Sequence, residues 1–159
     1  MAGPQCCSNP PILNPSYGVD CAEKLGGLNV YAAGSPNFKL AIVLVSDVFG
    51  KVVTELAKSD FIQAAVLLHP SFVALDDIEG VKVPMAVLGA EIDEYSPLEL
   101  LKQFEEILAA KSEIDSYVKI FPKAEHSWTV RYNVEDEEAV KRAEEAHNNM
   151  IDWFSKHVK

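Results

Sequence analysis

The 159-residue sequence contains no apolar run near the roughly 20 residues that a membrane span requires. It also lacks a basic start followed by an apolar segment, so we expect no secretory signal and a cytosolic protein. Basic residues are few, because 14 Lys and Arg stand against 24 Asp and Glu, a formal net charge of −10. Phosphate binding requires clustered Lys and Arg, so we expect no nucleic-acid partner, and no membrane partner either.

Cysteine is also scarce, with three residues at positions 6, 7 and 21. An odd number near the start of a cytosolic chain favours reduced thiols over a disulfide framework. Neither a histidine nor a second cysteine pair stands nearby at the spacing of zinc ligands. The sequence therefore predicts no metal site.

The hydrophobic content of 48% and the length fit one globular domain. Residues 1–22 are rich in proline and lack periodicity, so we expect an irregular arm followed by a domain over residues 23–159. Apolar segments predict strands at residues 28–32, 40–45, 63–68, 85–89 and 117–121, and Lys119 favours an edge position for the last of these. We expect residues 40–45 to lie parallel beside residues 63–68.

Three segments with helical periodicity lie between or after these strands, at residues 51–58, 96–110 and 136–157. Ser96-Pro97-Leu98-Glu99 predicts a capping box at the start of the second helix. The acidic run at residues 135–138 fits a solvated first helical turn better than an interaction patch. The face expected to be buried on the last helix carries Val140, Ala143, His147, Met150, Ile151 and Phe154. Alternating strands and helices predict a mostly parallel, three-layer α/β sheet.

Two polar residues come just after predicted strands, Asp93 after residues 85–89 and His126 after residues 117–121. An acid followed by a histidine on successive strand ends is the chain order of a nucleophile–acid–histidine triad in an α/β-hydrolase. The histidine takes the proton of the nucleophile, and the acid fixes the imidazole tautomer. We therefore predict Asp93 and His126 to form an acid–histidine pair.

Three segments then resemble landmarks of the dienelactone hydrolase family: Leu-Val-Ser-Asp-Val-Phe-Gly at 44–50, Val-Leu-Gly-Ala-Glu-Ile-Asp at 87–93 and Ala-Glu-His-Ser-Trp-Thr-Val-Arg at 124–131. The start, Met-Ala-Gly-Pro-Gln-Cys-Cys, resembles plant cytosolic members, some of which carry an endo-1,3;1,4-β-glucanase label. The resemblance implies an α/β-hydrolase-type fold and hydrolysis of small lactones or carboxylic esters through a Cys-Asp-His triad. It implies no cofactor.

The chain departs from this family at its nucleophile. Relatives carry a Gly-x-Cys-x-Gly elbow, and by resemblance a block containing it has dropped out at about Gly50 and Lys51, together with two central strands of the sheet. Ser46 precedes a turn and a helix, but it lacks the flanking glycines of an elbow. We therefore expect a sheet shortened at its centre and a protein that is inactive or weakly active.

The resemblance also assigns roles to other residues of this sequence. It makes Asp93 the triad acid, His126 the triad base, and Asp47 a contact of the resting thiol. It makes the Val48 amide one donor of the oxyanion hole and Arg131 a ligand for a substrate carboxylate. Ser127 stands where relatives usually have glycine.

Several alternatives stay open from the residues alone. His69 fits a structural histidine better than a catalytic one, and Trp128 fits packing beside the His126 loop better than a stacking platform. The chain could instead be a non-catalytic binding module that self-associates or pairs with a full-length relative. An incomplete gene model is a further alternative, and the substrate is not predicted.

Overall fold

The computed structural model describes residues 21–25, 28–32 and 50–159. The chain divides into two compact units, Ile12–Val43 and a second unit that includes Leu44–Lys159. In the smaller unit, β1 (Cys21–Leu25) pairs antiparallel with β2 (Leu28–Ala32). The strand expected at residues 28–32 therefore forms. The boundary expected at residue 22 falls inside β1, and that division into arm and domain stays a prediction.

The larger unit is built on a sheet whose described strands are all parallel. These are β3 (Ala65–Leu68), β4 (Met85–Ile92) and β5 (Ser116–Glu125), in the spatial order β3-β4-β5. Ala65 pairs with Met85, and Met85 pairs with Ser116, so the three strands start level with one another. β5 forms an edge of the described sheet, as predicted. The strand expected at residues 40–45 lies outside the described part of the chain.

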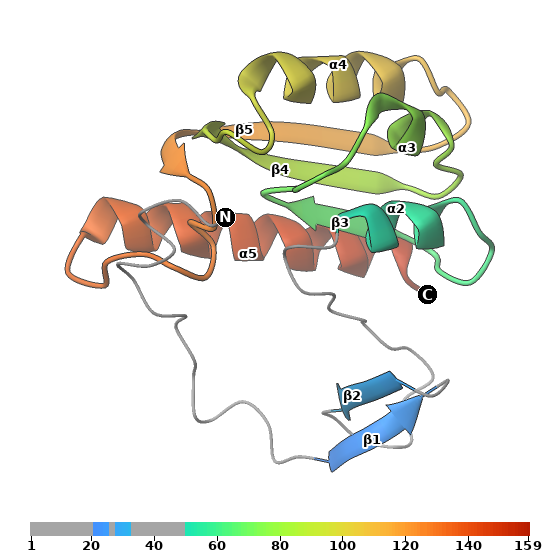
Figure 1. Cartoon of the computed structure of the whole chain (residues 1–159), viewed down its shortest axis with the longest axis horizontal. Coiled ribbons are helices and arrows are strands. Elements are labelled where there is room, and N and C mark those ends of the chain that lie inside the picture. The colour runs from blue at the N-terminus through green and yellow to red at the C-terminus, as the bar shows by residue number, and fades with distance from the viewer. Residues whose placement is uncertain (1–20, 26–27, 33–49) are drawn as a thin grey trace. The chain divides into compact units, whose positions relative to one another are not determined.

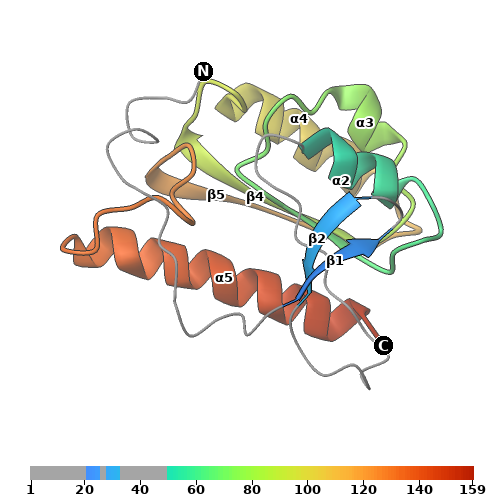
Figure 2. The ribbon, with the colours of Figure 1, turned by 60° about the horizontal axis from the view of Figure 1, so that its bottom comes forward.

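Helices cover both faces of this sheet (Figures 1 and 2). One face carries α3 (Leu75–Glu79) and α4 (Leu98–Ala109), with α2 (Gly50–Ala57) in contact with β3 and α3. The opposite face carries α5 (Glu137–His157), which contacts all three strands. The predicted three-layer α/β architecture is confirmed, although the short helix α3 was not predicted. No helix among the described residues has the length and apolarity needed to cross a bilayer.

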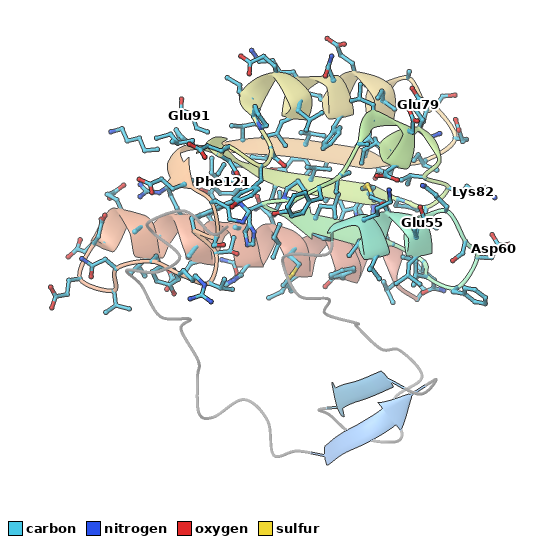
Figure 3. All side chains as sticks on the ribbon, in the orientation of Figure 1. Glu55, Asp60, Glu79, Lys82, Glu91 and Phe121 are labelled. Atoms are coloured by element: carbon cyan, nitrogen blue, oxygen red, sulfur yellow. The ribbon has the colours of Figure 1, made fainter. Side chains whose placement is uncertain are left out.

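The central strand β4 supplies both halves of the core. Met85 and Val87 pack with the α4 layer, whereas Leu88 and Ala90 pack with the α5 layer, as expected for side chains that alternate between the faces of a strand. Figure 3 shows Phe121 between the sheet and α5, where it belongs to the same cluster as Leu88. Because both faces of β4 are covered, it reads as a continuous apolar run rather than an alternating one.

The start of α4 differs from the sequence prediction. Its N-cap is Pro97, and no side chain caps it. The Ser96 hydroxyl instead donates a hydrogen bond to the carbonyl of Pro70, 26 residues earlier in the chain. The predicted capping box is therefore wrong, because a tertiary acceptor takes the hydroxyl that the local pattern assigned to the helix.

The start of α5 agrees with prediction, and its buried face agrees except at Ile151. Asp136 caps the helix by accepting from the amides of Glu138 and Ala139 at 3.0 and 3.2 Å. Trp153 is buried, whereas Ile151, which we expected on the buried face, is 54% exposed. The sheet determines which side of this long helix it covers, and periodicity alone does not fix that side.

Candidate active site

Three loops leave the carboxyl ends of β3, β4 and β5 and carry His69, Asp93 and His126 respectively. Because the strands are parallel, all three loops meet at one edge of the sheet. In open α/β sheets this edge is where ligands bind. Figure 3 marks this end of the sheet by Glu91, near the end of β4, while Lys82 lies at the opposite end.

Asp93 is fixed in place by the turn that follows β4. Its Oδ1 accepts from the amides of Tyr95 and Ser96 at 2.8 and 3.4 Å. Its Oδ2 faces Nδ1 of His126 at 2.7 Å, and the Asp93 side chain is fully buried. A carboxylate held by backbone amides cannot rotate freely, so it presents one oxygen to the imidazole.

This contact orients the His126 ring, with Nδ1 bound to Asp93 and Nε2 directed away from it. Nδ1 donates to Asp93, which leaves Nε2 as the proton-accepting nitrogen of the neutral ring. The side chain of His126 is 13% exposed, so solvent and small ligands reach only part of the ring. The predicted pairing of Asp93 with His126 is thus present as a contact, and this arrangement suits general-base chemistry at Nε2.

The group that faces Nε2 is the hydroxyl of Ser71. Ser71 Oγ lies 3.5 Å from His126 Nε2, and Ser71 is buried. The loop that carries it has left-handed backbone at His69, with φ 40°, and at Phe72, with φ 58°. Residues other than glycine rarely adopt this backbone conformation, and backbone strain of this kind is concentrated at functional sites.

Aromatic rings border the imidazole on one side. The Tyr95 ring centroid lies 4.8 Å from that of His126, and the Phe72 ring lies 5.8 Å from that of Tyr95. Phe72 is 65% exposed, which is unusual for a phenylalanine next to a buried polar cluster. The two rings give the candidate site an apolar wall.

Histidine and tryptophan side chains support His126 from another side. His69 is buried, forms a 2.8 Å hydrogen bond between its Nε2 and Thr129 Oγ1, and meets the His126 ring edge-on at 5.1 Å. Trp128 is buried and packs against His69 and Phe121. Both residues therefore pack beside His126; the sequence favoured this packing for Trp128 and a structural role for His69.

Asp47 and Val48 lie outside the described residues, as does Ser46, so their predicted roles stay predictions. Arg131 lies in the turn after His126, where its amide donates to the carbonyl of Ser127 at 2.9 Å. Its role toward a substrate carboxylate also stays a prediction. Within residues 50–159 and the two short strands, no cluster of His, Cys, Asp or Glu could hold a metal ion.

Sequence reasoning missed Ser71 and Tyr95. The missing elbow led us to expect that no hydroxyl stands at the imidazole, yet Ser71 does so from the loop after β3. A usable signal existed, because Ser71 follows a predicted strand just as Asp93 and His126 do. Residues after adjacent parallel strands meet at one edge, and that rule includes Ser71.

The comparisons with known proteins agree with this architecture. The model of the dienelactone hydrolase family matches residues 48–158, which include every element from α2 to α5. A carboxymethylenebutenolidase homolog from Xenopus tropicalis is 32% identical over 113 residues, which are 69% of this chain and 46% of that protein. An endo-1,3;1,4-beta-D-glucanase from Zea mays is 34% identical over 65 residues, or 41% of this chain and 22% of that protein.

Solved structures are similar in fold. A crystal structure assigned as a dienelactone hydrolase from Klebsiella pneumoniae superposes with a TM-score of 0.56 at 18% identity, over 68% of this chain and 48% of that one. The acylaminoacyl peptidase of Pyrococcus horikoshii gives a TM-score of 0.50 at 14% identity, over 69% of this chain and 22% of that one. The chain thus spans less than half the length of each of these relatives.

Proposed function

Because this chain belongs to the dienelactone hydrolase family, we propose that it hydrolyses a small carboxylic ester or lactone with Asp93 and His126 as its acid–histidine pair. The observation that carries the proposal is the 2.7 Å contact between Asp93 Oδ2 and His126 Nδ1 at the carboxyl edge of the sheet. The name of the Xenopus relative specifies a butenolide, which is a lactone, and this supports the substrate class.

The chemistry follows from the orientation of the imidazole. Nε2 takes a proton from the group that attacks the acyl carbon, and Asp93 stabilises the imidazolium that forms. Nε2 then returns the proton to the leaving oxygen. General-base catalysis typically contributes 10²- to 10⁴-fold over the uncatalysed rate. Because the sequence lacks the family's cysteine elbow, we expect the rate enhancement over the uncatalysed reaction to lie within that range.

The geometry favours an ester or lactone over a glycoside. Glycosidases use two carboxyl groups on either side of the scissile bond. Both oxygens of Asp93 are occupied, one by the amides of Tyr95 and Ser96 and the other by His126. Asp93 is therefore directed to the imidazole, so we do not transfer the glucanase label of the maize relative.

We place the protein in the cytosol within the same proposal. Support comes from the segment Met-Ala-Gly-Pro-Gln-Cys-Cys, which resembles plant cytosolic members of the family. Fractionation of the source cells with an antibody to this chain tests the compartment.

Ester and lactone hydrolysis by purified variants tests the catalytic proposal. We expect the full chain to hydrolyse p-nitrophenyl acetate or dihydrocoumarin above the buffer rate. We expect His126→Gln and Asp93→Asn to lower that excess rate by about 100-fold or more, because each change removes the oriented base.

The chain offers a matched control in a second histidine–carboxylate pair. His157 Nε2 lies 3.2 Å from Asp115 Oδ2, and Asp115 directly precedes β5, at the end of the sheet opposite His126. We expect His157→Gln to keep the wild-type rate. Equal rates for the wild type and His126→Gln would reject the proposed function.

A further inference from the structure

We infer that Ser71 is the nucleophile of this site, with His126 as its base; the inference rests on the proposed function. Asp93 Oδ2, His126 Nδ1, His126 Nε2 and Ser71 Oγ form one continuous chain of contacts, 2.7 Å at the acid and 3.5 Å at the serine. This is the order of groups in a serine–histidine–acid triad. A serine–histidine contact is often longer in the free protein and shortens in the substrate complex.

The serine is held to the same turn that holds the acid. Ser96 donates its hydroxyl to the carbonyl of Pro70, the residue before Ser71, and its amide to Asp93 Oδ1. One residue thus connects the backbone next to Ser71 with the carboxylate that orients His126. Such an anchor keeps nucleophile and base at a fixed separation, which is what intramolecular proton transfer requires.

The start of α2 lies directly against Ser71. A β-carbon added to Gly50, the first residue of α2, would stand 3.1 Å from the Ser71 carbonyl oxygen and 2.8 Å from Val73 Cγ2. The first-turn amides of a helix have no acceptor within the helix, and they carry the positive end of its dipole. We include this helix start in the inference as the group that would favour the negative charge developing when a serine attacks a carbonyl.

The reaction balances without a cofactor. Ser71 Oγ forms a bond to the acyl carbon while its proton moves to His126 Nε2. The bond between the acyl carbon and the leaving oxygen then breaks, and His126 returns the proton to that oxygen. Water next attacks the acyl-serine, gives a proton to His126, and releases the carboxylic acid as Ser71 recovers its proton.

A fluorophosphonate provides a direct test, because it traps activated serines. Ser71 Oγ would form a bond to phosphorus, fluoride would leave, and His126 would take the hydroxyl proton. Peptide mapping of the labelled full chain by mass spectrometry should place the adduct on Ser71. We expect His126→Gln to slow labelling by about 100-fold or more. Ser112→Ala, which removes an exposed hydroxyl on another loop, should label like the wild type.

Ser71→Cys gives an independent readout if Ser71→Ala fails to fold. Its new thiol should react with iodoacetamide faster than the cysteines at positions 6, 7 and 21, and adding His126→Gln should remove that advantage. A thiol at position 71 that reacts at the same rate with and without His126 would overturn the inference.

The results separate this inference from the proposed function. Hydrolysis that depends on His126 but is unchanged in Ser71→Ala, with no adduct on Ser71, would reject Ser71 as the nucleophile. The proposed hydrolase activity would then still stand. Labelling of Ser71 that depends on His126, without ester or lactone turnover, keeps the activated serine and rejects the hydrolase. Absence of both signals rejects both.

Discussion

Leu101 of α4 packs so closely on Gly89 of β4 that a β-carbon at position 89 would stand 2.4 Å from Leu101 Cδ1. Leu101 is fully buried, so its side chain has little room to move away. The glycine therefore lets α4 lie against the central strand, four residues before Asp93. This contact is one of those that set the approach of α4 to the sheet, beside the packing of Met85 and Val87.

We accordingly expect Gly89→Ala to lower the free energy of unfolding by about 1–3 kcal/mol, the usual cost of overfilling a packed core. Urea denaturation measures the change. Leu101→Val, which shortens the opposing side chain, should recover part of the loss when combined with Gly89→Ala. Gly80→Ala is the matched control, because there the contact is the flexible stem of Lys58. An equal loss at both glycines would contradict this account.

Ser127 follows His126 directly and has left-handed backbone, with φ 67°. A side chain in this conformation costs about 1–2 kcal/mol relative to glycine. We compare Ser127→Gly with Ser127→Ala, since both remove the hydroxyl and only alanine keeps the β-carbon. The glycine variant should be more stable by about 1 kcal/mol in thermal or urea unfolding. Equal stabilities would show that the backbone relaxes without cost.

Asp77 joins α2 and α3, and its charge depends on its partners. Burial raises the pKa of this carboxyl. The Ala74 amide at 3.0 Å, the Lys58 ammonium at 3.1 Å and the Lys51 ammonium at 3.9 Å lower it, and together they outweigh the effect of burial. The net pKa lies below the ordinary value. A depressed folded-state pKa contributes stability above the unfolded value near 4, and that stability is lost as the pH falls through the folded value.

We therefore expect Asp77→Asn to be less stable than the wild type at pH 7 and for this difference to shrink as the pH falls below about 4. Urea unfolding at a series of pH values measures it. Asp76→Asn, a neighbouring acidic residue in the same turn, should leave the pH dependence close to that of the wild type. A difference that stays constant from pH 7 to pH 3 would contradict the role of the Asp77 charge.

Phe72 and Tyr95 predict a preference for substrates with a flat apolar group. Their rings lie 5.8 Å apart, and Tyr95 borders the His126 ring. An aromatic contact contributes about 0.5–1.5 kcal/mol, so Phe72→Ala should raise KM for phenyl acetate by about 2- to 10-fold. The KM for methyl acetate should change little. Equal effects on both esters would indicate that Phe72 shapes the loop rather than the substrate contact.

Much of the fold was predictable because its signals are local. The β4 segment is continuously apolar, the residues of β2 alternate, and Asp136 precedes an acidic first turn, so each element was found near its true position. The Asp93–His126 pair was predictable for another reason, since chain order places both residues at the same edge of a parallel sheet.

The contacts that local signals missed cross long stretches of chain. The Ser71 hydroxyl meets His126 across 55 residues, and the Ser96 hydroxyl reaches Pro70 across 26. A serine before Pro-Leu-Glu has the pattern of a helix cap, and only the folded chain supplies the competing carbonyl. The burial of Trp153 in place of Ile151 has a similar origin, because the sheet determines which side of α5 it covers.

The hydrogen bonds described above for the candidate site join residues between 69 and 129. Among the described residues, this segment holds the candidate site through contacts of its own, and α2 meets it at Ser71. Such a self-contained block suits protein engineering, because a foreign nucleophile can be grafted beside an imidazole that is already oriented.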